Sequence, residues 1–271
     1  MNLFIFICQQ TLIFLVPLLL VGLGDLFSER SGVLNIALEG IMVFGAFAGI
    51  MFIRSASAAM PSWLVLLIAI LISILAGMLL SALHAFASIH LKAEQTISST
   101  AIITFATAFC IFYARVMLGT EQVVFRNTFR IDAVPLLSKI PVLGPILFQK
   151  AYVTTYLGIL VLIVTAFILK RTRFGLRLRS CGENPQAADS VGISVYKMRY
   201  AGVLISGALA GLGGLVFILP TTTTYTASVS GYGFLAMSVV VFGQWKPWGI
   251  ALGALFFGLT KTIAASYSVI P

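Results

Sequence analysis

The feature that most constrains this chain is the recurrence of apolar stretches of about 20 residues, separated by short polar segments. A stretch of that length matches a helix that crosses the hydrocarbon core of a bilayer. Applied along the sequence, this requirement predicts about eight transmembrane helices. Their expected ranges are 4–24, 31–53, 63–87, a span that begins within 95–100 and ends at 118, 152–169, 200–219, 227–245 and 248–267.

Composition indicates the same fold class, an all-α polytopic integral membrane protein with a single transmembrane domain over residues 1–271. Some of its helices are expected to be discontinuous. Hydrophobic residues make up 60% of the chain and charged residues 9%, which excludes an ordinary soluble globule. Residues 1–24 lack a basic leading segment and a small-residue cleavage site, so they are predicted to stay as the first span. Since the sequence stops at Pro271, shortly after the last span and without a polar tail, we expect the chain to continue with at least one further helix.

The longest polar interruption, residues 170–199, is strongly basic. It contains seven Lys/Arg and only two acids, Glu183 and Asp189. Lysine and arginine are enriched in loops on the cytoplasmic side of membranes, so this segment is predicted to be a cytoplasmic loop. Counting spans from it places the N-terminus and the proline-containing loop at 119–151 on the extracytoplasmic side. The same bias explains the net charge of +9, and we expect no nucleic-acid binding.

Inside this basic segment, the sequence NPQAADSVG carries the signals of a short capped helix. Asn184 suits the N-cap, Pro185 the first helical position and Gly192 the position after the helix end. We therefore predict a separate helix over 185–191 within the loop.

Glu39 is the acid that lies most clearly inside a predicted span. An ionisable side chain at membrane depth is costly and commonly faces the protein interior or an aqueous path. Asn35, four residues earlier, is expected on the same helix face, so the pair predicts a polar stripe along a pathway. The alternative is structural, with Glu39 hydrogen-bonded to a neighbouring helix or fixing a kink beside Gly40.

A second candidate for the pathway is the polar start of the fourth span, with Gln95, Ser98 and Thr100. A broken helix there would expose backbone groups that line a cavity. The alternative is that the hydroxyls bond back to their own helix. In the sixth span, a stripe of small residues predicts close helix packing. Its glycines are Gly207, Gly211 and Gly214.

No motif for catalysis, nucleotide binding or metal binding occurs in the sequence. The phosphate loop G-x-x-x-x-G-K-[ST], H-E-x-x-H, G-x-S-x-G and C-x-x-C patterns are absent, and the cysteines and histidines are not at ligand spacing. We therefore expect no enzyme activity, no catalytic residue, no cofactor and no metal site in this chain. If ATP drives its function, another chain must bind the nucleotide.

Four blocks, in order, resemble the permease subunits of bacterial ABC importers. They are ERSGVLNIALEGIMVFGAFAG (29–49), FGLRLRSCGENPQAADSVGIS (174–194), SGALAGLGG (206–214) and GYGFLAMSVVVFGQWKPWGIALGALFFG (231–258). The branch is the one shared by ribose-type simple-sugar and branched-chain amino acid permeases, and the first block is most similar to the nucleoside importers. The resemblance covers most of the chain from Glu29 to Gly258.

The resemblance implies a multi-pass permease of the bacterial cytoplasmic (inner) membrane that forms half of a translocation pathway for nucleosides, with simple sugars as the alternative. It also implies ATP-binding cassette subunits, a second permease chain, an extracytoplasmic substrate-binding protein and membrane lipid as partners. A short cytoplasmic coupling helix in such permeases docks on the ATPase. The matching residues here are Gly182, Glu183, Asn184, Pro185, Ala187, Ala188 and Gly192.

Two function classes compete with this interpretation. In an ion-coupled secondary transporter, Glu39 would carry a coupling proton and no ATPase would be needed. In an intramembrane enzyme acting on lipid, a paired nucleophile and base or a metal cluster would be expected, and the sequence offers neither.

Overall fold

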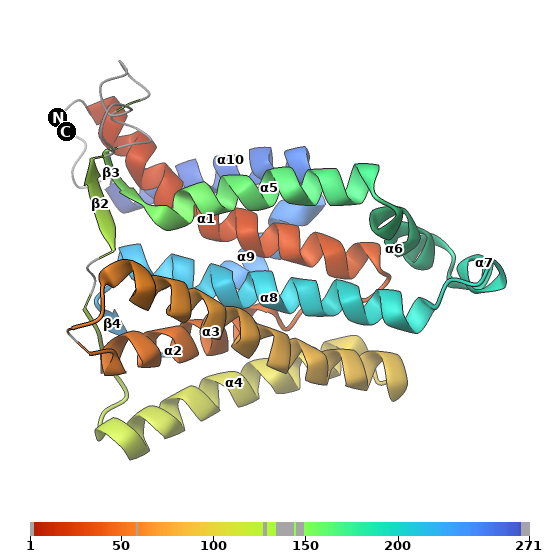
Figure 1. Cartoon of the computed structure of the whole chain (residues 1–271), viewed down its shortest axis with the longest axis horizontal. Helices are drawn as coiled ribbons and strands as arrows, with labels where there is room; N and C mark the ends of the chain where they lie inside the picture. Colours follow the sequence, from red (N-terminus) through yellow and green to blue (C-terminus); the bar gives the residue numbers. More distant parts are fainter. Residues whose placement is uncertain (1–2, 58, 127–128, 134–143, 145–148, 267–271) are drawn as a thin grey trace.

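The structure is a computed structural model that describes residues 3–57, 59–126, 129–133, 144 and 149–266. It is a bundle of long helices, with short strands at one end and two short helices protruding at the other (Figure 1). Within the described residues, seven helices are long and apolar enough to cross a membrane. They are α1 (Leu3–Arg30), α2 (Leu38–Ser55), α3 (Ser62–Ala85), α4 (Gln95–Leu118), α5 (Val153–Arg171), α8 (Val195–Thr221) and α10 (Pro247–Ser266).

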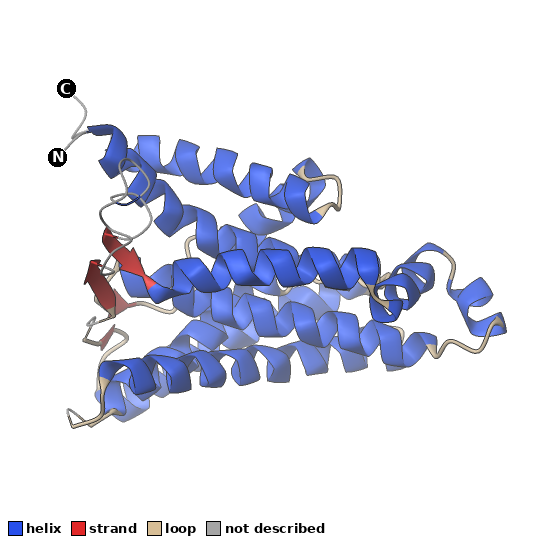
Figure 2. Cartoon of the chain, turned by 45° about the horizontal axis from the view of Figure 1, so that its top comes forward, coloured by secondary structure: helices blue, strands red, loops and turns tan. Residues whose placement is uncertain are grey.

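The remaining elements are short. A π-helix, η1 (Phe86–His90), continues α3, and α9 (Tyr232–Phe242) is an 11-residue apolar helix that packs against α1, α2 and α10. The helices α6 (Arg173–Glu183) and α7 (Pro185–Ser190) form what we call the α7 end of the molecule. At the opposite end, which we call the strand end, the strands form two antiparallel pairs (Figure 2). They join β1 (Val123–Val124) to β4 (Thr224–Tyr225) and β2 (Arg130–Ala133) to β3 (Gln149–Tyr152). Much of the predicted loop at 119–151 lies outside the described residues.

The bundle is organised around α8, which is buried over most of its length and packs against α1, α2 and α3. Three glycines of α8 lie at its contacts with α2 and α3. A Cβ at Gly207 would collide with the Ser81 side chain of α3, and one at Gly211 would collide with the backbone of α3. A Cβ at Gly214 would meet the backbone of α2 at Met42. In lipid, such small residues let helix backbones touch, so α2, α3 and α8 form a closely packed frame.

The connection between the first two spans differs from the expected one. The sequence predicts that the first span ends before Asp25, but α1 continues to Arg30 because Asp25 is buried inside the bundle. The second span is expected from residue 31, yet α2 begins at Leu38. The intervening chain turns at Gly32, which has a φ of +84°, and the Ser28 hydroxyl donates to the Val33 carbonyl at 2.8 Å.

The stretch expected to span at 227–245 is not one continuous helix. Only Tyr232–Phe242 is helical, and 11 residues reach about 16 Å, roughly half of a bilayer core. Positive φ angles at Ala227, Ser230 and Gly231 prevent helix in the residues before it.

A break in the fourth span, predicted within 95–100, is not present, because α4 is continuous from Gln95. The Glu94 carboxylate caps α4 by accepting from the N–H groups of Thr96 (3.0 Å) and Ile97 (2.7 Å). These bonds lower the pKa of Glu94. The discontinuity in the bundle therefore lies before α9 and not at the start of α4.

Candidate functional site

The chain between α8 and α9 runs along α2 in a mostly extended form. Thr224 pairs with Val124, whose carbonyl accepts from Arg54 near the end of α2 at 3.0 Å. Seven residues later, the Gly231 N–H donates at 2.9 Å to Glu39 near the start of α2. Between these two points, the Tyr225 hydroxyl donates to the Val43 carbonyl in the middle of α2 at 2.7 Å. The segment thus runs alongside α2 without being helical.

Glu39 holds the first turn of α9 from this neighbouring helix. Its Oε1 accepts from the N–H of Gly231 at 2.9 Å, and its Oε2 accepts from the N–H of Gly233 at 2.7 Å. The first N–H groups of a helix have no partner in the helix and carry partial positive charge, so a carboxylate is suited to them. A Cβ at Gly233 would collide with the backbone of Glu39. Glu39 is thus hydrogen-bonded to a neighbouring helix, as its structural alternative predicts. A role of Glu39 in a pathway stays a prediction.

The side chains of the extended segment alternate strictly between buried and exposed. Tyr225, Ala227 and Val229 are buried. Between them, Thr226, Ser228 and Ser230 are exposed, and we call these three residues the hydroxyl row. The row borders a cavity of about 300 Å³. This cavity is lined by Phe217, Ile218, Thr221, Thr222, Thr224, Tyr225, Thr226, Ser228 and Ser230.

The sequence reading missed the hydroxyl row. The signal that could have revealed it is the period-two alternation of apolar and hydroxyl residues over 224–230, which is typical of a strand and not of a helix. The high apolar content of the following residues outweighed that signal.

Asn35 does not share a helix face with Glu39, so that prediction was wrong. Asn35 precedes α2, in the turn region that follows Gly32, and its side chain is fully buried. Its Nδ2 donates to the Ser206 hydroxyl of α8 at 3.0 Å. Asn35 therefore ties the connection between α1 and α2 to the central helix.

Gln95 and Ser98 are brought together around the backbone of Leu34. The Leu34 N–H donates to the Gln95 side-chain oxygen at 2.9 Å, and the Leu34 carbonyl lies 3.0 Å from His84 Nε2. Because a carbonyl only accepts, Nε2 carries the imidazole proton, and Nδ1 accepts from the Ser98 hydroxyl at 3.1 Å. Thr100 is exposed on α4, and its hydroxyl donates to the Thr96 carbonyl of its own helix at 2.8 Å.

Asp25 is a fully buried acid whose burial the sequence does not predict. Its side chain is fully buried in α1, and neither carboxylate oxygen has a hydrogen-bond partner in the described part of the chain. Glu29, one helical turn later, accepts a hydrogen bond from the indole N–H of Trp245. Two acids at i and i+4 in an otherwise apolar stretch were the available signal.

The basic segment folds into two helices, of which the sequence predicted one. In α6, the residues Gly175, Leu178 and Cys181 are buried on one face, and burial raises the pKa of the Cys181 thiol. In the predicted helix, Asn184 Oδ1 accepts from the Ala187 N–H at 3.0 Å, Pro185 is the first residue and Gly192 has a φ of +81°. The helix α7 therefore has the caps expected from its sequence.

The two alanines of α7 face opposite ways. Ala187 is exposed, whereas Ala188 is 3% exposed and packs toward its own chain. Gly182, just before α7, lies against the end of α1, where a Cβ would collide with the Arg30 carbonyl. Only part of the predicted docking set, with Ala187 in it, is thus available to a partner.

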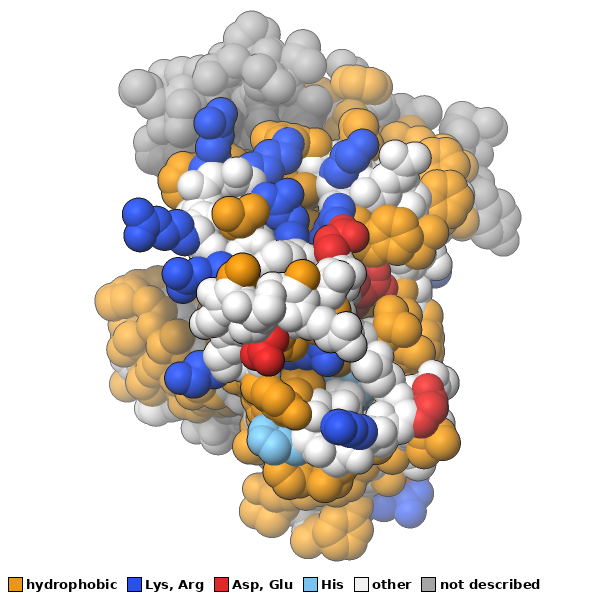
Figure 3. Space-filling view, turned by 90° about the vertical axis from the view of Figure 1, so that its right-hand side faces the viewer, with side chains coloured by type: hydrophobic (Ala, Val, Ile, Leu, Met, Phe, Trp, Pro, Cys, Tyr) orange, Lys and Arg blue, Asp and Glu red, His pale blue; other side chains and the backbone are white. Residues whose placement is uncertain are grey.

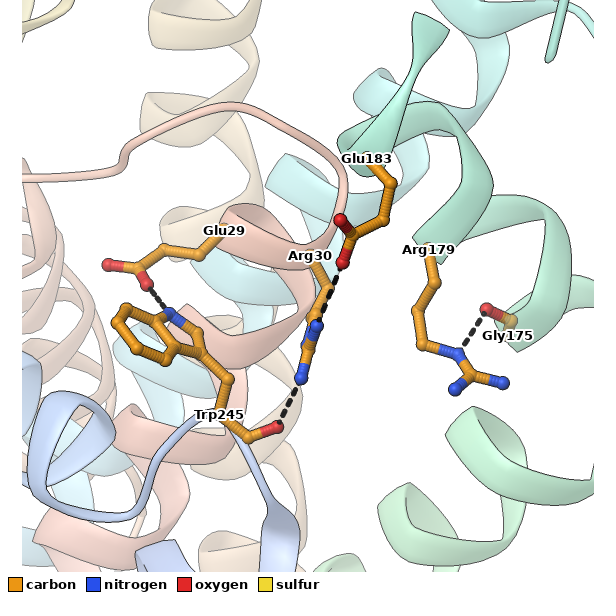
Figure 4. Close-up of polar contacts among 6 residues, drawn as sticks. All are labelled: Glu29, Arg30, Gly175, Arg179, Glu183 and Trp245. Atoms are coloured by element: carbon orange, nitrogen blue, oxygen red, sulfur yellow. Dashed lines mark hydrogen bonds and ion pairs between the residues drawn. The ribbon is translucent and has the colours of Figure 1, made fainter. Parts of the chain in front are cut away.

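Arg30 joins three parts of the α7 end (Figure 4). Its Nη1 forms an ion pair with Glu183 at 3.5 Å, and its Nη2 donates to the Trp245 carbonyl at 3.0 Å. Glu183 directly precedes the cap of α7, and Trp245 lies in the short connection between α9 and α10. Gln244 and Trp245 both have a φ of +52°, so this connection is a tight turn of non-glycine residues.

The face at the α7 end carries mainly positive charge (Figure 3). Lysine and arginine side chains gather over α6 and the ends of the neighbouring helices, with few acids among them. Within the described residues, no group of three or more His, Cys, Asp or Glu could hold a metal ion.

Comparison with known proteins gives a consistent result. The family described as "Branched-chain amino acid transport system / permease component" matches residues 7–270. The guanosine ABC transporter permease protein NupQ of Bacillus subtilis is 44% identical over 98% of this chain and 83% of its own length. The nucleoside ABC transporter permease protein NupC of Lactococcus lactis subsp. cremoris is 40% identical over 98% and 84%.

A more distant relative is the putative glucose ABC transporter permease protein TsgC13 of Haloferax volcanii, which is 36% identical over 91% of this chain and 73% of its own length. No solved structure matches significantly.

The cap on α9 generates a prediction about stability. Glu39→Ala leaves two partly buried N–H groups without an acceptor, which costs about 2 kcal/mol, so the thermal unfolding midpoint of the purified protein should fall. Glu39→Gln keeps one acceptor oxygen and should cause a smaller fall. Glu121→Gln, which alters an exposed acid paired with Arg115, is the control. An unchanged midpoint for Glu39→Ala would contradict the capping role.

Proposed function

The chain belongs to the family of permease components of branched-chain amino acid transport systems, and we propose that within it this chain is the nucleoside-transporting permease subunit of an ABC importer. The observation that carries the substrate is near-full-length similarity to two permeases named for guanosine and nucleosides, at 44% and 40% identity. Simple sugars are the second candidate, because a putative glucose permease is 36% identical.

The α7 end faces the cytoplasm in this proposal. Its basic surface supports that orientation, since lysine and arginine are retained on the cytoplasmic side and can also meet anionic lipid headgroups. The strand end then faces a substrate-binding protein outside. Partner ATP-binding subunits hydrolyse ATP, and this chain contributes no catalytic group.

The translocation path passes the discontinuous segment before α9. Backbone that has left the helix at membrane depth is tolerated only where it is covered by protein or lines a water-filled cavity. The buried side of the segment packs on α2, and its exposed side carries hydroxyls. A second permease subunit facing the hydroxyl row would complete such a path.

Movement of the ATPase enters the chain at α7 and reaches α9 through Arg30. Glu183, the last residue of α6 and the neighbour of the α7 cap, pairs with Arg30, and Arg30 bonds to Trp245 in the turn after α9. The other end of α9 is held by Glu39 beside the hydroxyl row. This chain of contacts supports α9 as the element that moves relative to the glycine-packed frame.

Both carboxylate oxygens of Glu39 are occupied by backbone N–H groups, which argues against the ion-coupled alternative. Uptake of labelled ribonucleosides, by cells carrying this chain with its ATPase and binding protein, separates the two functions. Uptake should require the ATPase and persist when the proton gradient is dissipated with cellular ATP held constant. Uptake without the ATPase would contradict the proposal.

If the ATPase docks at α7, a substitution on the exposed face of α7 should uncouple ATP hydrolysis from uptake. Ala187→Phe places a bulky side chain on the exposed face of α7, so nucleoside uptake should fall about tenfold or more while the protein reaches the membrane in normal amount. ATP hydrolysis by the purified complex should no longer respond to substrate-loaded binding protein. Ala187→Ser is the matched control, because it stays small. Normal uptake by Ala187→Phe would refute docking at this face.

The contacts of Arg30 predict a second variant in which ATP hydrolysis is uncoupled from uptake, although the exposed face of α7 is unchanged. Arg30→Met removes both bonds, so uptake should fall several-fold with ATP hydrolysis retained within about twofold, because an exposed pair adds little to stability. Arg30→Lys keeps a positive charge for Glu183 and should be intermediate. The control is Arg115→Met, which breaks the exposed ion pair to Glu121 on α4. Equal uptake by Arg30→Met and the control would show that Arg30 transmits nothing.

A further inference from the structure

The hydroxyl row has the features of a binding surface and not of a lipid-facing or core surface. Thr226, Ser228 and Ser230 are exposed although the segment follows α2 through the membrane-spanning part of the fold. In the described part of the chain, the Thr226 and Ser230 hydroxyls make no hydrogen bond, and the Ser228 hydroxyl accepts only the Ser230 N–H at 3.2 Å. These groups are available to a solute.

The backbone fixes the direction of the row. Ala227 and Ser230 have φ angles of +52° and +54°, which are uncommon for residues with a Cβ. Such strained residues persist where the surroundings hold them, and they cluster at functional sites. Here Tyr225 anchors one side, because its hydroxyl donates to the Val43 carbonyl at 2.7 Å, and Glu39 anchors the other.

The chemistry of the cavity selects a class of ligand. All the polar side chains that line it are hydroxyls, which both donate and accept hydrogen bonds, and none is charged. The nearby carboxylate of Glu39 is already bonded to two N–H groups. The lining residues include no cation that could pair with a phosphate group. They do offer hydroxyls that can exchange hydrogen bonds with the hydroxyls of a neutral sugar ring.

We propose that the hydroxyl row binds the sugar hydroxyls of the passing solute, which for a nucleoside are those of its ribose, and that it disfavours the phosphorylated form. This inference rests on the proposed transport function and adds the part of the substrate that this chain recognises. The hydroxyls of the row replace water around the sugar as the solute crosses. Removing one hydroxyl from the row should therefore lower the uptake rate by the factor that corresponds to the free energy of one hydrogen bond.

The test compares substrates that differ in one hydroxyl. Initial uptake of ribonucleosides and of their 2′-deoxy and 3′-deoxy forms is measured for the wild type and for Thr226→Val, Ser228→Ala and Ser230→Ala, with the same binding protein. Ribonucleoside uptake should fall about three- to tenfold in the row variants. For at least one deoxy form, the same variant should change uptake less than about twofold, because the bond is already missing.

Thr223→Val is the matched control, since Thr223 is an exposed neighbour that does not line the cavity. Its uptake should stay at the wild-type rate for all substrates. Equal losses for ribonucleosides and both deoxy forms in every row variant, or no loss at all, would overturn the inference.

A wrong nucleoside assignment would be recognised by a different result in the wild type. If the wild type takes up ribose and no nucleoside, the nucleoside assignment fails, and the row is tested by the same comparison between ribose and 2-deoxyribose. If the wild type, with its ATPase and binding protein, takes up neither class, both proposals are overturned.

Discussion

The interaction on which this structure depends most is the pair of hydrogen bonds from the Gly231 and Gly233 N–H groups to Glu39. In a bilayer, each backbone polar group needs a partner within the protein, and a helix that starts in mid-membrane leaves its first N–H groups without one. A carboxylate on α2 supplies that partner. The cap allows α9 to be short, which in turn allows the chain before it to be extended and to expose hydroxyls.

The bundle divides into a frame and an element attached to it. Along α8, glycine contacts such as those of Gly211 and Gly214 bring backbones together, and these close-packed helices have little freedom to slide. The helix α9 packs against α1, α2 and α10, and hydrogen bonds hold it at both ends, through Glu39 at one and through the turn that contains Trp245 at the other. Because Arg30 connects that turn to the base of α7, a displacement of α7 has a direct route to α9.

Much of the fold could be predicted from the sequence because lipid imposes simple rules. Helix length and apolar content located the spans, and local capping residues located α7, since Asn184 and Gly192 act on their immediate neighbours. The sequence reading failed where distant contacts decide conformation. The sequence predicts a helix end at Asp25, because the burial of that side chain depends on packing by other helices, and it predicts Asn35 on α2 although the chain turns after Gly32. The sequence also predicts helix from Ala227 onward, because the positive φ angles at Ala227 and Ser230 have no signature in residue type.

Thiol accessibility along the extended segment tests the central claim most directly. Single cysteines at positions 226, 227, 228, 229 and 230 are introduced into a Cys8→Ser background, in which the remaining Cys110 and Cys181 are buried. Cells are then treated with a membrane-impermeant maleimide. The account predicts that Thr226→Cys, Ser228→Cys and Ser230→Cys react and are protected by nucleoside, while Ala227→Cys and Val229→Cys do not react. Reactivity without that alternation, or none at all five positions, would contradict an extended segment that lines an aqueous path.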